Sequence, residues 1–204
     1  MVELSRADRQ RIETATREAE QHTSGEIVTV MAQRSDDYQF IPVLWATLAA
    51  LFVPMPLIFL TSLPADLVYL VQLTVFAVLF VLLRWPALRL AVTPRSIKRQ
   101  RAHRLAMEQF LAQNIHMTDQ RTGVLIFLSM AERYIEIIAD QGIYEKVDKQ
   151  IWDKTVQAMS AHIRQGQIAD GFVEAVSSCG QVLARHFPPG SSNVDELPNT
   201  IIEI

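Results

Sequence analysis

Two long runs of uncharged residues lie in the interior of the sequence and restrict what the chain can fold into. No charged residue occurs from Phe40 to Leu63 or from Leu67 to Leu83, and only Pro64, Ala65 and Asp66 separate the two runs. A transmembrane helix needs about 20 predominantly apolar residues. The pattern therefore predicts a helical hairpin in a bilayer. A buried core hairpin of a soluble protein is the weaker interpretation, because soluble core helices rarely lack charge for so long.

The first apolar run contains Pro54 and Pro56 near its middle. Proline removes a backbone hydrogen-bond donor, so we expect a kink in the first span. A re-entrant first segment is the alternative. Neither run contains an ionisable group of the kind that marks a transport pathway. The hairpin is therefore interpreted as an anchor.

Basic residues set the expected orientation of the hairpin. The connection between the spans contains no Lys or Arg, whereas the segment after the second span is basic. The basic residues of that segment are Arg84, Arg89, Arg95, Lys98, Arg99, Arg101 and Arg104. Under the positive-inside rule this flank stays in the cytoplasm, and a two-span hairpin returns the chain to its starting side. We expect the soluble domain and both termini to be cytoplasmic.

Composition and motifs exclude several classes of protein. The formal net charge of -3 argues against a nucleic-acid binder, which is usually basic overall. Cys179 is the only cysteine, so an internal disulfide and a multi-cysteine metal site are excluded. Cys179 lies on the apolar stripe of a predicted helix and is interpreted as a small core residue. The sequence contains no Gly-rich phosphate loop and no nucleophile elbow.

The soluble parts of the chain alternate between helical and extended patterns. Amphipathic spacing and capping residues predict helices at 5–22, 93–115, 148–165 and 168–187. Segments rich in β-branched or continuously apolar residues predict strands at 26–31, 123–129 and 133–139. The last two strands are close enough in sequence to form an antiparallel hairpin. Residues 189–204 are predicted to be a flexible tail, and its isoleucines could dock on a partner.

The order of these elements resembles the TPM domain family. The resemblance rests on T-S-G-E-I-V in the first strand, R-T-G-V-L-I-F-L-S in the second, and R-Y-I-E-I-I-A-D-Q-G-I in the third. It covers Ser5–Met31 and about Ser96–Phe187. The resemblance implies an α/β fold, a TPM-like sandwich with a central mixed sheet flanked by helices. In this chain the sandwich is interrupted by the two-helix transmembrane hairpin.

The resemblance and the apolar runs together divide the chain into four segments. Residues 1–37 and 93–188 are predicted to form the two parts of the TPM-like domain. Residues 38–92 form the hairpin with an interfacial segment, and 189–204 form the tail. Because members of the family are mostly membrane-associated, the resemblance and the hairpin together lead us to expect a multi-pass protein of the bacterial inner (cytoplasmic) membrane.

Six residues are predicted to lie at the membrane interface. Arginine and tryptophan are typical of the headgroup boundary, and basic residues are attracted to anionic lipid. The set consists of Trp85, Arg84, Arg89, Arg95, Lys98 and Arg99. A solvated face that merely obeys the orientation rule is the alternative interpretation.

Carboxylates at the ends of the predicted strands are the candidate metal ligands. Asp36 and Asp37 follow the first strand, Glu132 precedes the third and Asp140 follows it. Loop carboxylates could bind Ca²⁺ or Mg²⁺, which prefer oxygen ligands, although ordinary solvation of loops is the alternative. No other cofactor is expected. Glu26 and Arg121 flank predicted strands and could pair to fix the sheet register, a structural role that we favour over catalysis.

These observations lead to a hypothesis for function. Family members include assembly and repair factors, a receptor accessory protein and a plant acid phosphatase, and bacterial members often accompany LemA-like membrane proteins. We expect a non-enzymatic, membrane-anchored adaptor or accessory protein. It would bind an integral membrane protein or complex, LemA-like proteins included, or help to assemble it. A metal-dependent phosphatase is the alternative.

Overall fold

The computed structural model describes residues 3–118, 120–189 and 196–204. The chain divides into two compact units, one made of 1–35 and 99–204 and the other of 36–98. The second unit is therefore an insertion into the sequence of the first, which we call the sheet domain.

The inserted unit contains two apolar helical stretches. The first runs from Phe40 to Leu60 and the second from Ala65 to Leu83, and both are long and apolar enough to cross a membrane. Val53 divides the first stretch into α2 (Phe40–Phe52) and α3 (Pro54–Leu60). The break directly precedes Pro54, in the region where the two prolines led us to expect a kink. The second stretch is the unbroken helix α4 (Ala65–Leu83), and α5 (Pro86–Val92) follows it.

Most large apolar side chains of this unit point outward. Residues of α2 pack against α4 through buried small or branched side chains, among them Ala46, Ala50 and Val68. The exposed fractions are 65% for Phe52, 79% for Phe59, 81% for Leu60 and 66% for Val81. So much exposed apolar surface is uncommon on a soluble protein and is typical of a surface that contacts other apolar material.

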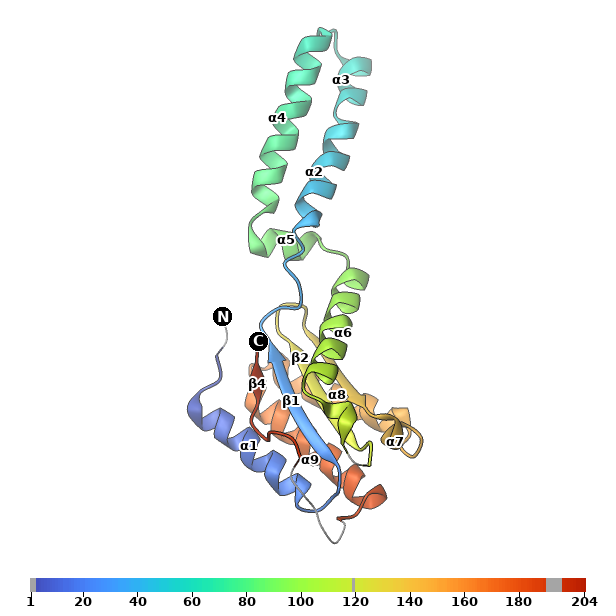
Figure 1. Cartoon of the computed structure of the whole chain (residues 1–204). Helices are drawn as coiled ribbons and strands as arrows, with labels where there is room; N and C mark the ends of the chain where they lie inside the picture. The colour runs from blue at the N-terminus through green and yellow to red at the C-terminus, as the bar shows by residue number, and fades with distance from the viewer. Residues whose placement is uncertain (1–2, 119, 190–195) are drawn as a thin grey trace. The chain divides into compact units, whose positions relative to one another are not determined.

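A four-stranded mixed sheet with the order β3-β2-β1-β4 forms the centre of the sheet domain (Figure 1). Strand β1 (Glu26–Ala32) is parallel to β2 (Gly123–Ser129) along its whole length, from Glu26 opposite Gly123 to Ala32 opposite Ser129. Strand β3 (Tyr134–Ala139) is antiparallel to β2, which confirms the predicted hairpin.

Helices cover both faces of the sheet (Figure 1). One face packs against α1 (Arg6–Glu20), α8 (Lys149–Arg164) and α9 (Ile168–His186). The other face packs against α6 (Arg95–Ala112). The fold is therefore the helix-flanked mixed sheet that the sequence predicts. Every residue of β1 and β2 is buried, as expected for central strands covered on both sides.

The core on the three-helix face contains the side chains that the helical stripes predict. Ile12, Trp152, Met159 and Phe172 pack there against residues of β1 and β2. Cys179 of α9 is fully buried in the same cluster, and burial raises the pKa of its thiol to about 12. Its position agrees with its interpretation as a core residue.

Local capping interactions define the ends of the helices. The Ser5 hydroxyl accepts a hydrogen bond from the Asp8 N–H at 3.1 Å, so the predicted N-cap of α1 is present. Asp148 caps α8 in the same way. Two short helices, η1 (Ile115–Met117) and α7 (Gln141–Tyr144), were not predicted from the sequence.

The C-terminal segment differs from the predicted flexible tail. Residues Ile202–Glu203 form β4, parallel to β1. The Ile204 N–H donates to the Met31 carbonyl at 3.0 Å, and Glu203 forms an ion pair with Arg9 of α1 at 2.5 Å. The segment is held because it satisfies backbone groups on the outer edge of β1. Residues 190–195, which were also assigned to the tail, lie outside the described part of the chain.

Candidate functional site

A polar cluster lies where the chain leaves β1. The Ser35 N–H donates to both carboxylate oxygens of Glu132 at 3.1 Å, and the Ser35 hydroxyl donates to the Ser129 hydroxyl at 2.8 Å. The fully buried Ser129 hydroxyl in turn donates to Glu132. We call Ser35, Ser129 and Glu132 the exit cluster. It fastens the end of β1 to the β2–β3 turn.

A second polar cluster lies at the opposite end of β3. Asp140 is only 6% exposed, accepts the Gln141 N–H at 2.7 Å as the N-cap of α7, and has Oδ2 3.2 Å from Arg121 Nε. Oδ2 is buried and makes no hydrogen bond of good geometry in the described structure, so the contact with Arg121 is an ion pair alone. We call Arg121, Asp140 and Gly142 the Asp140 cluster.

Gly142 belongs to this cluster because its backbone approaches the preceding loop closely. A Cβ atom at this position would lie 2.7 Å from the Arg121 carbonyl oxygen and 2.9 Å from that of Gln120. Both distances are shorter than carbon–oxygen contacts allow, so only glycine fits without movement of the backbone. Close packing against the preceding loop therefore requires the glycine of the D-Q-G sequence that follows β3.

The structure does not bring the predicted metal ligands together within the sheet domain. Glu132 precedes β3 and Asp140 follows it, so the length of the strand, roughly 20 Å, separates them. Asp36 and Asp37 belong to the inserted unit, where Asp36 accepts the Tyr38 N–H at 2.7 Å. Among the described residues, no group of three or more His, Cys, Asp or Glu side chains has a geometry suited to a metal ion.

The predicted Glu26–Arg121 pair is wrong. Arg121 pairs with Asp140 and donates to the His116 carbonyl at 2.9 Å. Glu26 accepts the N–H of Leu197, from the C-terminal segment, at 3.3 Å. Arg121 has a positive φ of 56°. Its side chain therefore points in a direction that the alternation of a regular strand does not predict.

The six residues predicted for the membrane interface fall into two groups. Arg84 and Trp85 lie between α4 and α5, Arg89 lies on α5, and Arg95 and Lys98 start α6, all within the inserted unit. The Arg84 guanidinium lies 5.9 Å from the ring centre of Phe80, and Trp85 is 69% exposed. Arg99 belongs to the sheet domain, where its charge acts on Tyr134.

Sequence reasoning missed a polar contact between α6 and β3. His103 Nδ1 lies 2.9 Å from both carboxylate oxygens of Glu136. Burial and the neighbouring Glu136 carboxylate raise the pKa of Tyr134. The alternation of β3 places Tyr134, Glu136 and Ile138 on the face that α6 covers, and this alternation was the available signal.

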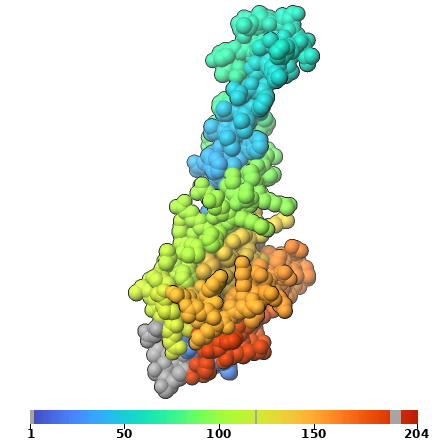
Figure 2. Space-filling view, turned by 90° about the vertical axis from the view of Figure 1, so that its right-hand side faces the viewer, coloured from blue at the N-terminus to red at the C-terminus, as the bar shows by residue number. Residues whose placement is uncertain are grey.

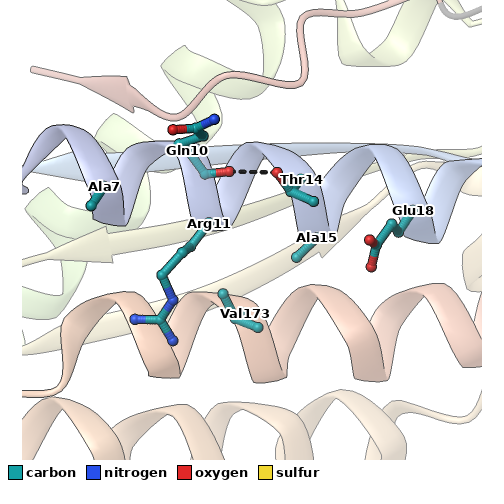
Figure 3. Close-up of a pocket in the computed structure, with 7 residues that line it drawn as sticks. All are labelled: Ala7, Gln10, Arg11, Thr14, Ala15, Glu18 and Val173. Carbon is teal, nitrogen blue, oxygen red and sulfur yellow. Dashed lines mark hydrogen bonds between the residues drawn. The ribbon is translucent and has the colours of Figure 1, made fainter.

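A shallow hollow lies on the outside of α1, next to α9 (Figure 3). Its wall is formed by Ala7, Gln10, Arg11, Thr14, Ala15 and Glu18 of α1 and by Val173 of α9. The Thr14 hydroxyl donates to the Gln10 carbonyl within the helix, and Arg11 pairs with Asp170 at 2.5 Å. These polar groups satisfy one another or face solvent, so the hollow offers no convergent set of groups for a substrate.

Comparison with known proteins agrees with the arrangement of strands and helices. The model of the TPM domain family matches residues 88–182. A TPM domain is therefore present in the chain, and its matched part runs from α5 to the last turns of α9. A search of curated proteins gives no match.

One solved structure is similar over nearly the whole chain. It is the NMR structure of the BA42 protein from the psychrophilic bacterium Bizionia argentinensis. The alignment covers 98% of this chain and 95% of BA42, with 23% sequence identity and a TM-score of 0.61. At this identity the likeness shows a shared fold.

We predict that Arg121→Gln lowers the free energy of unfolding by about 1 kcal/mol. The substitution leaves the buried Asp140 carboxylate opposite a neutral group, and the exposure of Arg121 limits the loss. Chemical denaturation in detergent would measure the change. Arg104→Gln is the matched control, because the Arg104–Glu108 pair is fully on the surface and should contribute less than about 0.5 kcal/mol. Equal losses in both variants would contradict the assignment.

Proposed function

We propose that the chain is a membrane-anchored TPM-domain adaptor that binds an integral membrane protein or helps to assemble its complex. The observation that carries the proposal is the parallel pairing of β1 with β2 across the insertion. Both ends of the apolar hairpin must return to one folded domain for this pairing to form. Such an insertion would tether the sheet domain at the bilayer through two neighbouring points, close to membrane-protein partners.

Chemistry at the ends of the strands is consistent with a binding role. The carboxylates of Glu132 and Asp140 each accept backbone N–H groups and contact neighbouring side chains. Groups engaged in this way hold loops in place. The basic residues Arg84, Arg89, Arg95 and Lys98 would add attraction to anionic lipid, at roughly 1 kcal/mol for each residue near the surface.

The proposed topology places the sheet domain in the cytoplasm and the α3–α4 connection outside the inner membrane of a bacterium. We predict that Ser62→Cys reacts with a membrane-impermeant maleimide applied to spheroplasts, whereas Gln21→Cys reacts only after lysis. Both positions are exposed, and the wild-type chain is a clean control because its single cysteine is buried. Labelling of Gln21→Cys from outside would reverse the orientation.

The adaptor proposal also predicts a stable membrane-protein partner. Tagged full-length protein, purified from native membranes in mild detergent, should copurify with one integral membrane protein at a near-stoichiometric ratio by quantitative mass spectrometry. An unrelated two-span protein with the same tag, expressed at the same level, corrects for non-specific recovery. A chain that retains no protein above this background would count against the proposal.

Asp140 favours a metal-dependent phosphatase as the second candidate function. Its buried Oδ2 lacks a hydrogen bond and lies beside Arg121, so an oxygen ligand for Mg²⁺ or Ca²⁺ and a guanidinium suited to phosphate would be adjacent. The described residues supply no third ligating side chain there, so the fit to a divalent cation is poor. We therefore rank this candidate below the adaptor.

The two candidates differ in a direct assay. We expect the purified full-length protein to hydrolyse p-nitrophenyl phosphate no faster than background with Mg²⁺ or Ca²⁺ present. Metal-dependent turnover that Asp140→Asn abolishes and Arg104→Gln leaves unchanged would instead establish the phosphatase.

A further inference from the structure

The two outer edges of the sheet differ in how their backbone groups are satisfied. On the β1 side, the Ile27 N–H donates to the Glu20 carboxylate at 2.8 Å, and the Met31 carbonyl accepts the Ile204 N–H at 3.0 Å. The β1 edge is therefore covered by a side chain and by β4. In the described part of the chain, β3 has a strand partner only on its β2 side.

The pairing register between β2 and β3 identifies the β3 backbone groups that point away from β2. The Asp140 N–H donates to the Gly123 carbonyl at 2.9 Å, so these two residues form a hydrogen-bonded pair. In an antiparallel ladder such pairs alternate with pairs that are not hydrogen-bonded. Tyr134, Glu136 and Ile138 therefore direct their backbone groups toward β2. The N–H and C=O groups of Ile135, Ile137 and Ala139 point to the open edge.

Strand β3 has few of the devices that usually protect an edge. Natural edge strands carry proline, charged side chains (lysine above all) or a bulge, or are very short. The β3 sequence Y-I-E-I-I-A has no proline or lysine, its only charged residue is Glu136, and its six residues pair with β2 without a bulge. All of them are partly exposed. In Figure 2, the yellow to orange segments that follow β2 reach the surface beside the green helix α6.

We propose that β3 pairs with β3 of a second copy of this chain, antiparallel, with Ile137 of both copies on the two-fold axis. A symmetric pair of identical edges must be antiparallel. This register places the residues whose backbone groups point to the open edge opposite one another, Ile137 against its counterpart and Ile135 against Ala139. Their side chains lie on the three-helix face of the sheet, partly buried against its core. On this face of the sheet the cross-strand pairs are entirely aliphatic, which stabilises strand pairing.

Charge selects this register over its neighbour. Pairing centred on Ile137 places Glu136 opposite Ile138 of the second copy. The neighbouring register, centred on Glu136, would place two carboxylates directly opposite each other, which is destabilising. The interface is small, but the proposed anchorage would confine both copies to one membrane plane and raise their effective concentration.

Site-directed crosslinking of the full-length protein in native membranes tests the proposal. Residues that form a hydrogen-bonded antiparallel pair have Cα atoms about 5.5 Å apart, within the range of a disulfide. Ile137→Cys should therefore form a covalent dimer on mild oxidation. The wild-type chain should form none, because Cys179 is fully buried and its thiol has a pKa of about 12.

Ala139→Cys is the matched control, since residue 139 lies on the same strand and the same face. Two copies of residue 139 would be roughly 14 Å apart in the proposed register, too far for a disulfide. Co-expression of Ile135→Cys with Ala139→Cys should restore the crosslink even if Ile137→Cys folds poorly. Equal crosslinking of Ala139→Cys alone would overturn the proposal. So would a monomer in all variants, or disulfides formed only with other proteins.

Discussion

The parallel pairing of β1 with β2 is the interaction on which the sheet domain depends. The two strands are adjacent in the sheet but are separated in sequence by the entire apolar insertion and by α6. Closing so long a loop costs little more than closing a moderate one, because loop entropy rises only logarithmically with length. Burial of the two strands, which are mostly apolar, offsets that cost. The domain can therefore hold a membrane-type hairpin within its chain.

Polar residues at the two ends of β3 connect the segments that adjoin this strand pair. The exit cluster fixes β1 to the β2–β3 turn through a buried hydroxyl and a carboxylate. The Asp140 cluster closes the other end through a helix cap, an ion pair and a close glycine contact. Glu132 and Asp140, two of the four candidate ligands, thus each have a structural role.

The open edge of β3 contrasts with the covered edge of β1. The two-residue strand β4 and the Glu20 side chain occupy part of the β1 edge. Strand β3 presents the backbone groups of alternate residues with no such cover in the described chain. Open strand edges pair readily with other strands. The β3 edge is therefore the part of the domain best suited to pairing with a strand of another molecule.

Local periodicity in the sequence determined the apolar hairpin, the break before Pro54, the cap at Ser5, the three long strands and the major helices. Each of these depends on neighbours within a few residues. Tertiary structure alone decided that Arg121 pairs with Asp140 rather than Glu26, that Glu132 and Asp140 lie apart, and that the C-terminus forms β4. Those outcomes depend on strand register, on a positive φ at Arg121 and on contacts between distant segments. No local pattern encodes them, because side-chain partners across a sheet are set by the packing of the whole domain.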